Sequence, residues 1–337
     1  MKKFLFSVLA VGALVACTKS EVKYEGETEI AFRPVASVAT KANVMHAIDG
    51  TVYPEDETFK VWGYWQLVDA ESDYTAFNNA TTYINERVFA LAEDKGDGKS
   101  LWRGTNQKYY WPKTGSMVFA CISPAEVEVF KHDVTKDQFI IAYNSPLNNA
   151  QTELDLENTI DLMWTNTTKS YNEKTAVPGV PVTFNHALSW ITFKVQGDDV
   201  TSNGGFVINS LTMNAVKSKG TFVSNPIEWQ GVQAEVEVPV YKGNENLTTT
   251  PAILENVEQG TLVIPQINNN KNYIATIEFT NTLGDVYINE VVTIDLGKGW
   301  EVGKHYTYYI KFTAREILIE PHVEDWVEVD PKDEYIF

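Results

Sequence analysis

Few residues in this sequence have the type and spacing that catalysis or metal binding requires. None of its histidines has a second His or Cys at metal-ligand spacing; they stand at His46, His132, His186, His305 and His322. Acidic pairs such as Asp155/Glu157 and Asp198/Asp199 could serve a glycosidase only if folding held the carboxyl groups about 5 to 10 Å apart across a cleft. We therefore predict that the protein is not an enzyme and has no catalytic, cofactor-binding or metal-binding residue.

The two cysteines have very different surroundings. Cys121 lies in an apolar run, Met117–Ile122, and is expected to be a small core residue. Cys17 ends an uncharged, mostly apolar run, Phe4–Ala16, that follows Lys2 and Lys3. Such a run suits an export signal and is too short to span a bilayer as a helix. The residues Leu14-Val15-Ala16-Cys17 resemble a bacterial lipobox, whose thiol takes a thioether-linked diacylglycerol.

This pattern predicts a signal peptide at residues 1–16 and a lipidated tether at 17–28. A diacylglycerol on Cys17 and a further acyl chain on its amino group would give stable attachment, which takes more than one chain. The lipidated chain is therefore expected to stay attached to a membrane.

Charge and cysteine content exclude several classes of protein. The net charge is −18, with 45 acidic residues against 27 basic ones, and loss of Lys2 and Lys3 increases the imbalance. Nucleic acid and bare anionic membrane are therefore poor partners. With Cys17 lipidated, Cys121 is the remaining thiol, so no disulfide framework forms within one mature chain.

Hydrophobic residues alternate with polar ones over most of the chain after residue 28. Three long examples are Val236-Glu237-Val238-Pro239-Val240, the run from Val286 to Leu296, and Tyr306 to Phe312. Gly-rich turns such as Asn203-Gly204-Gly205 separate these runs. Period-2 patterns with frequent turns predict an all-β protein built from sandwiches. Helix is scarce, and a short one is expected around Ala125–Val129.

Two domains of similar size are expected, at residues 29–178 and 179–337. The boundary is placed at Val177-Pro178-Gly179-Val180-Pro181, because prolines and glycine interrupt strand pairing. The following run, Val182 to Val195, shifts its alternation, which predicts a bulge or bend near His186–Trp190. Phe184, Ile191 and Phe193 are expected in the second core, near the first strand of the second domain, and His186 is expected to be packed and hydrogen-bonded.

Several short motifs, in this order, resemble the fimbrillin family of Bacteroidales, the subunits of type V pili. After the lipobox, the motifs are Ile30–Pro34, Thr40–Ala42, Phe59–Tyr64, Tyr109–Pro112, Val182–Ile191, Leu262–Gln266, Trp300–Tyr308 and Val323–Trp326. Trp190 stands where a basic residue is commoner in the family. The resemblance implies two transthyretin-like β-sandwich domains in tandem and a structural role in a cell-surface fimbria. It also implies that the lipid anchor lies in the outer membrane, with the protein exposed on the cell surface before it joins the fimbria.

The resemblance also implies a route of assembly. A trypsin-like surface protease would cut after a basic residue and remove the first strand, and another fimbrillin subunit would donate a strand to the groove. Arg33 and Lys41 are the two candidate cleavage residues. We favour Lys41, because Pro34 follows Arg33 and lacks the backbone N–H that such proteases grip. Whether the segment Val327–Phe337 is the donor strand stays open.

A second hypothesis is a monomeric outer-membrane surface lipoprotein, or a pilus tip, that binds glycan or a host ligand. The N-terminal sequence of protein recovered from cells distinguishes the two. A fimbrial subunit would lose its N-terminal segment and form ladders on mildly heated gels, and a monomeric binder would keep Cys17 and its lipid.

Overall fold

The structure is a computed structural model, and it describes residues 28–34, 53–70, 79–92, 101–129, 131–146, 160–166, 169–254, 260–283, 286–313 and 316–325. The described part of the chain is almost entirely β-strand, which confirms the all-β prediction. Its one named helix is α2 (Asp199–Asn203), where the Asp198 carboxylate caps the helix by accepting from the N–H groups of Val200 and Thr201. The predicted helix at Ala125–Val129 is wrong, because this segment forms a turn in which the Ala125 N–H donates to the Thr58 carbonyl.

The first half of the chain forms an eight-stranded sheet in the order β10-β8-β5-β2-β3-β4-β1-β9. Its strands are β1 (Phe32–Pro34), β2 (Phe59–Gln66), β3 (Thr81–Leu91), β4 (Trp102–Gly104), β5 (Ser116–Ser123), β8 (Met163–Asn166), β9 (Val180–Val182) and β10 (Asn185–His186). Its two end strands, β9 and β10, follow one another in the chain, so the sheet curls around its inner face. That face holds the first core, which includes Phe32, Phe59, Phe89, Phe119 and Phe184.

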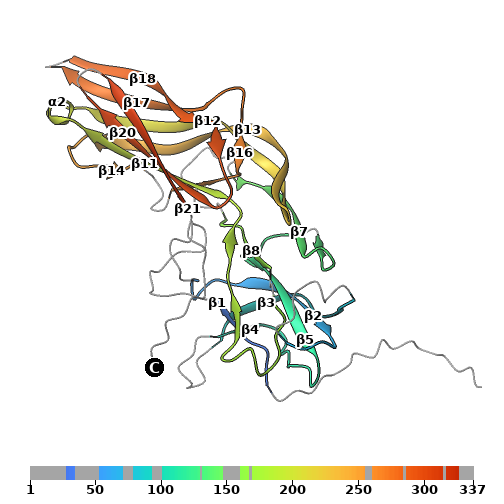
Figure 1. The fold of residues 1–337 in the computed structure, drawn as a ribbon. Coiled ribbons are helices and arrows are strands. Elements are labelled where there is room, and N and C mark those ends of the chain that lie inside the picture. The colour runs from blue at the N-terminus through green and yellow to red at the C-terminus, as the bar shows by residue number, and fades with distance from the viewer. Residues whose placement is uncertain are drawn as a thin grey trace, which may run out of the picture.

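The second half, together with one hairpin from the first half, forms a sandwich of two sheets (Figure 1). One sheet has the order β18-β17-β12-β7-β6 with β13 also on β12, and the other has the order β14-β11-β20-β21 with β15 also on β11. The strands are β6 (Lys131–Asp133), β7 (Gln138–Asn144), β11 (Ser189–Gly197), β12 (Val207–Ser224), β13 (Ile227–Asn246), β14 (Ala252–Ile253), β15 (Thr261–Val263), β17 (Tyr273–Leu283), β18 (Val286–Gly297), β20 (Lys304–Phe312) and β21 (Ile317–Asp325). A separate small sheet pairs β16 (Gln266–Ile267) with β19 (Gly299–Trp300).

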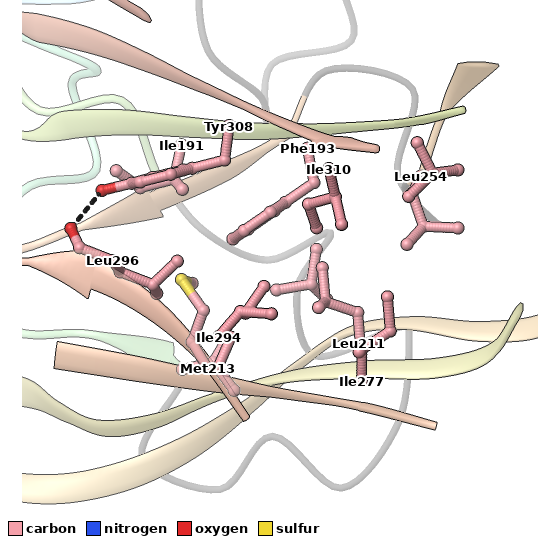
Figure 2. Close-up of a cluster of buried hydrophobic side chains, with 14 of the residues drawn as sticks. Ile191, Phe193, Leu211, Met213, Leu254, Ile277, Ile294, Leu296, Tyr308 and Ile310 are labelled. Atoms are coloured by element: carbon pink, nitrogen blue, oxygen red, sulfur yellow. Dashed lines mark hydrogen bonds between the residues drawn. The ribbon is translucent and has the colours of Figure 1, made fainter. Parts of the chain in front are cut away.

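The second core lies between the two layers of this sandwich (Figure 2). Phe193 and Tyr308 stack from neighbouring strands of one sheet, and Ile277 faces them from the other. The Tyr308 hydroxyl donates to the Leu296 carbonyl over 2.8 Å, which satisfies a polar group inside an apolar core. The predicted alternation of Tyr306, Tyr308, Ile310 and Phe312 is confirmed, because all four side chains are buried.

A third cluster joins the two halves. Strand β5 is buried along its whole length, so its alternate side chains serve two cores: Phe119 and Cys121 face the first core, and Val118 and Ile122 face the third cluster. Leu262 reaches the same cluster from the second half of the chain. The two halves therefore share buried apolar surface, which contributes to stability in proportion to its area.

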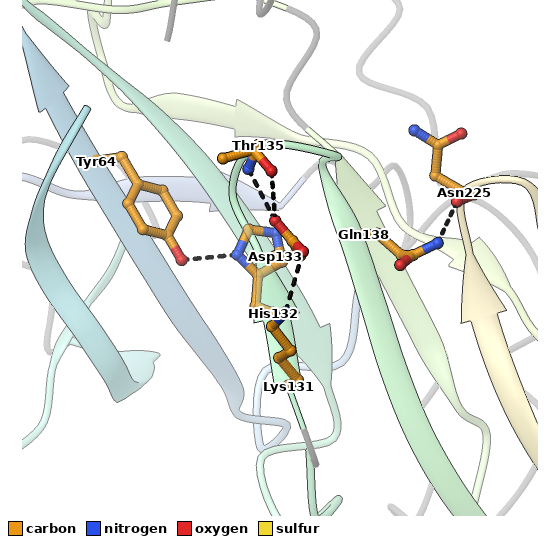
Figure 3. A network of polar contacts seen from close by, with 7 residues as sticks. All are labelled: Tyr64, Lys131, His132, Asp133, Thr135, Gln138 and Asn225. Atoms are coloured by element: carbon orange, nitrogen blue, oxygen red, sulfur yellow. Dashed lines mark hydrogen bonds and ion pairs between the residues drawn. The ribbon is translucent and has the colours of Figure 1, made fainter. Parts of the chain in front are cut away.

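The hairpin of β6 and β7 strengthens this junction. It comes from the first half of the chain, yet β7 pairs with β12, with Ile141 opposite Phe222. Nδ1 of His132 on β6 shares a 2.7 Å hydrogen bond with the Tyr64 hydroxyl on β2 (Figure 3). Asp133 beside it accepts from Thr135 and Lys131, and these contacts lower the pKa of its carboxyl to about 2. The hairpin thus contacts the eight-stranded sheet, and it also extends the sandwich sheet that contains β12.

The shifted alternation after Val182 coincides with a bend at Leu188, inside the predicted range His186–Trp190, where the chain changes sheet. Val182 and Phe184 point into the first core, whereas Ile191 and Phe193 point into the second. The expected place of Phe184 in the second core is therefore wrong, because the chain passes from the eight-stranded sheet to the sandwich between β10 and β11. The division at residue 178 stays a proposal, and β9 and β10, which follow it, pair within the first sheet.

Candidate functional site

The first strand is held on both of its edges by main-chain pairing. β1 runs antiparallel to β4 and parallel to β9, with Phe32 opposite Trp102 on one side and Val180 on the other. Just before it, the Ile30 N–H donates to the Tyr109 carbonyl over 2.7 Å, and the Ala31 carbonyl accepts from the Val180 N–H over 2.9 Å. We call residues 28–34 the first-strand segment and the groove between β4 and β9 its seat.

The side chains of this segment fill the middle of the first core. Phe32 is fully buried and meets three other rings edge to face: Phe89 at 4.9 Å, Phe119 at 5.0 Å and Phe59 at 5.9 Å between centroids. Ile30 is also fully buried. Edge-to-face pairs add to the energy of apolar burial. Withdrawal of the segment would leave an apolar groove flanked by unpaired backbone groups.

A glycine allows the chain to approach the segment closely. A Cβ at Gly179 would lie 3.2 Å from the Ala31 carbonyl oxygen and 3.1 Å from the Leu101 side chain. These distances are shorter than ordinary Cβ contacts, so any other residue here would require the Leu101 side chain or the backbone of Ala31 to shift by a few tenths of an ångström. The Val177–Pro181 stretch, which suggested a domain boundary in the sequence, thus forms one wall of the seat.

One ion pair connects the segment to β4. The Arg103 guanidinium lies 3.6 Å from the Glu29 carboxylate, and the two side chains are only 19 % and 11 % exposed. Sequence reasoning missed both residues. Neither stands in a recognisable motif, and they are brought together by pairing between distant parts of the chain.

A buried acid lies beside the seat. Trp102, which pairs with Phe32, donates its indole N–H to the Glu57 carbonyl over 3.1 Å. Burial raises the pKa of the Glu57 carboxyl to about 8; the Thr58 N–H, which donates to it over 2.7 Å, offsets part of this, and nearby negative charges led by Glu126 add to it. The folded protein therefore favours the neutral acid.

This raised pKa predicts a loss of stability as pH rises. The folded pKa lies above the usual value of 4.5, so the contribution is complete below about pH 4.5 and is lost on the way to about pH 8. Glu57→Gln is expected to remove this part of the pH dependence, measured as urea midpoints between about pH 5 and pH 8. Glu290→Gln, at an exposed position, is the control and should keep the wild-type slope. An unchanged slope in Glu57→Gln would contradict the assignment.

The structure places some of the sequence-predicted residues and not others. Arg33 lies within β1, half-buried and in register with Pro181. Cys17 and Lys41 lie outside the described residues. Cys121 is a buried core residue, as predicted, and burial raises the pKa of its thiol. His186 is buried with Nδ1 3.0 Å from an Asp161 carboxylate oxygen, which confirms that it is packed and hydrogen-bonded.

The described residues contain neither a cluster of metal ligands nor a membrane-spanning helix. No group of three or more His, Cys, Asp or Glu side chains there could hold a metal ion. No helix in the same residues has the length and apolar character to cross a membrane.

Comparison with known proteins identifies the family. The sequence profile of the family described as fimbrillin-like matches residues 36–326. The fold is similar to a fimbrial protein from Bacteroides vulgatus, with a TM-score of 0.64 and 15% identity over 89% of this chain and 99% of that one. It is also similar to a candidate cell-adhesion protein from Bacteroides uniformis, with a TM-score of 0.54 and 12% identity over 89% and 98% of the two chains. No curated protein matches at significant similarity. Because the family profile covers most of the sequence, this chain belongs to the fimbrillin-like family.

Proposed function

We propose that this protein is a structural subunit of a cell-surface fimbria and contributes to adhesion. The observation that carries the proposal is the first-strand segment, which lies near the start of the chain, is paired on both edges and supplies two fully buried side chains to the core. Its removal would expose apolar surface and unpaired backbone together, and one incoming strand would cover both. Membership of the fimbrillin-like family and the likeness in fold to a fimbrial protein support the same function.

Assembly on this proposal begins with proteolysis. A trypsin-like surface protease cuts after Lys41 and frees the first strand, and a strand from another fimbrillin subunit enters the seat. The incoming strand would extend the sheet between β4 and β9, as β1 does. Main-chain hydrogen bonds would supply affinity and the ring cluster around Phe32 would supply specificity.

The sequence offers one segment that could act as the incoming strand. Glu334-Tyr335-Ile336-Phe337 repeats the residue types of Glu29-Ile30-Ala31-Phe32, an acid, two apolar residues and then phenylalanine. A second copy of the chain would therefore carry a strand with side chains of the kind that the seat already holds.

Before assembly, the protein would travel as a lipoprotein anchored through Cys17 in the outer membrane. Cys17→Ala is expected to abolish acylation and to leave the precursor unprocessed or the protein soluble in the periplasm. Incorporation of a labelled fatty acid and fractionation of the cells would measure this. Cys121→Ala is the matched control, since a thiol buried in the core should not affect acylation. A Cys17→Ala protein that is still acylated and surface-attached would contradict the anchor.

One experiment tests the fimbrial function as a whole. Protein recovered from cells is sequenced from its N-terminus and run on mildly heated gels. A fimbrial subunit gives a shortened N-terminus and ladders of high mass. A monomer that keeps its lipidated Cys17 would instead support a surface lipoprotein that binds glycan or a host ligand, and would overturn the proposal.

A further inference from the structure

The ion pair between Glu29 and Arg103 joins the first-strand segment to β4 beside the apolar side chains that fill the seat. Both side chains are mostly buried, at 11 % and 19 % exposure, and their charged atoms are 3.6 Å apart. Breaking such a pair by removing one partner is costly, because it leaves an uncompensated charge out of water. Any strand that enters the seat without an acid in this place would deprive Arg103 of the ion pair that it makes among the described residues.

The position of Arg103 is fixed by the sheet. It is the central residue of β4, it pairs with Ala90 on β3, and it directly follows Trp102, the partner of Phe32. Extending the antiparallel register of β1 and β4 puts Arg103 opposite Ala31 and diagonal to Glu29. Diagonal neighbours on one face of an antiparallel pair are within reach of long side chains.

Apolar packing alone sets the register of a strand incompletely. A slip by one residue turns the buried face outward and is strongly disfavoured. A slip by two residues keeps the same face buried, and it would put the aromatic side chain in the position that Ile30 occupies. That slip also moves the acid away from Arg103. The ion pair therefore distinguishes the native register from the register shifted by two residues, although both bury the same face of the strand.

We infer that Arg103 selects the strand that the seat accepts, by requiring an acidic residue three positions before the aromatic side chain that fills the place of Phe32. The inference rests on the proposed strand exchange and names its partner more closely: an extended strand with the order acid, apolar, small or apolar, aromatic, supplied by a second copy of a fimbrillin-like chain. Charge complementarity of this kind contributes to specificity and register more than to affinity.

The test uses the full chain with a site for a sequence-specific protease in place of residues 38–44. After cutting, the protein is mixed with an excess of fluorescent peptide corresponding to Thr28–Pro34, and bound peptide is measured by anisotropy after gel filtration. Peptides with Glu29→Gln and Glu29→Arg are compared with the native one. We expect the occupancy of the Glu29→Arg peptide to be at least about tenfold lower than that of the native peptide, with the Glu29→Gln peptide between them.

Variants of the protein provide the reciprocal comparison. Arg103→Glu is expected to invert the preference, so that the Glu29→Arg peptide binds better than the native one. Arg103→Gln, which removes the charge and keeps most of the length of the side chain, is expected to bind all three peptides within about twofold of one another. This variant replaces Arg103→Glu as the test if Arg103→Glu does not fold. Circular dichroism of each variant checks folding.

The outcomes separate this inference from the proposed function. If all three peptides enter the wild-type seat equally well, strand exchange stands and the role of Arg103 is wrong. If no peptide enters the cut protein, strand exchange itself is overturned, and the selectivity of Arg103 with it. Inverted preference in Arg103→Glu supports both.

Discussion

Phe32→Ala is expected to lower the free energy of unfolding by about 3 to 5 kcal/mol, the usual range for removing a buried phenylalanine. The ring is fully buried and contacts three other phenylalanine rings, from β2, β3 and β5. No backbone rearrangement can close the cavity easily, because β1 is paired on both edges. Urea unfolding, followed by tryptophan fluorescence through the transition of the first core, would measure the change.

Two further variants make this result specific. Phe32→Leu keeps a large apolar side chain and loses the ring contacts, so a smaller loss is expected. Val291→Ala, at a side chain that is 64% exposed on β18, should change stability by less than about 0.5 kcal/mol. A loss below about 1 kcal/mol in Phe32→Ala would contradict the central place of this ring.

The consequence for assembly follows from the same contacts. In a chain cut after the first strand, only noncovalent interactions hold the segment in its seat. Phe32 supplies a large part of them, because Ile30 and Phe32 are the fully buried side chains of the segment. The Phe32→Ala segment should therefore leave the cut protein faster than the wild-type segment, which the peptide assay above would detect as faster exchange.

Local patterns in the sequence predicted the strands well, because period-2 alternation depends only on neighbouring residues. β20 and β13 are examples: Tyr308 and Ile310, like Val238 and Val240, are buried as their alternation predicted. The same reasoning could not assign strands to sheets. Phe184 and Phe193 lie in one apolar run of the sequence, but they fill different cores, because the chain changes sheet between them.

The junction between the halves shows a second limit. The hairpin of β6 and β7 follows β5 in the chain and would be expected to join the same sheet. It pairs with β12 instead, which places Ile141 opposite Phe222. No local pattern encodes such a pairing, since it depends on complementary surfaces that form only when both halves fold.

The candidate site, too, could be predicted only in part from the sequence. The resemblance to the fimbrillins implied an early strand at Ile30–Pro34, and β1 lies at Phe32–Pro34. The ion pair between Glu29 and Arg103 has no sequence signal, because neither residue type nor spacing distinguishes it from ordinary surface charge. Only the register of β1 and β4 brings the two side chains together.

Lys41→Gln is expected to block assembly completely while the full-length lipoprotein remains on the cell. Proteases of this kind bind an extended, accessible backbone on both sides of a basic residue. Lys41 is flanked by the small residues Thr40 and Ala42. Arg33 offers a much poorer site, since it is half-buried within β1, lies in register with Pro181 and is followed by Pro34. Loss of the high-mass ladders on mildly heated gels, with retention of the acylated precursor, is the expected result.

Matched variants decide between the two basic residues. Lys41→Arg keeps a residue that trypsin-like proteases accept, so it should assemble like the wild type. Arg33→Gln removes the other candidate and should also assemble. In the wild type, the mature chain should begin at Ala42, which N-terminal sequencing would measure. Because cleavage at Lys41 is what frees the first strand on this proposal, unchanged polymers in Lys41→Gln, or a mature N-terminus at another residue, would show that the strand is released elsewhere or not at all.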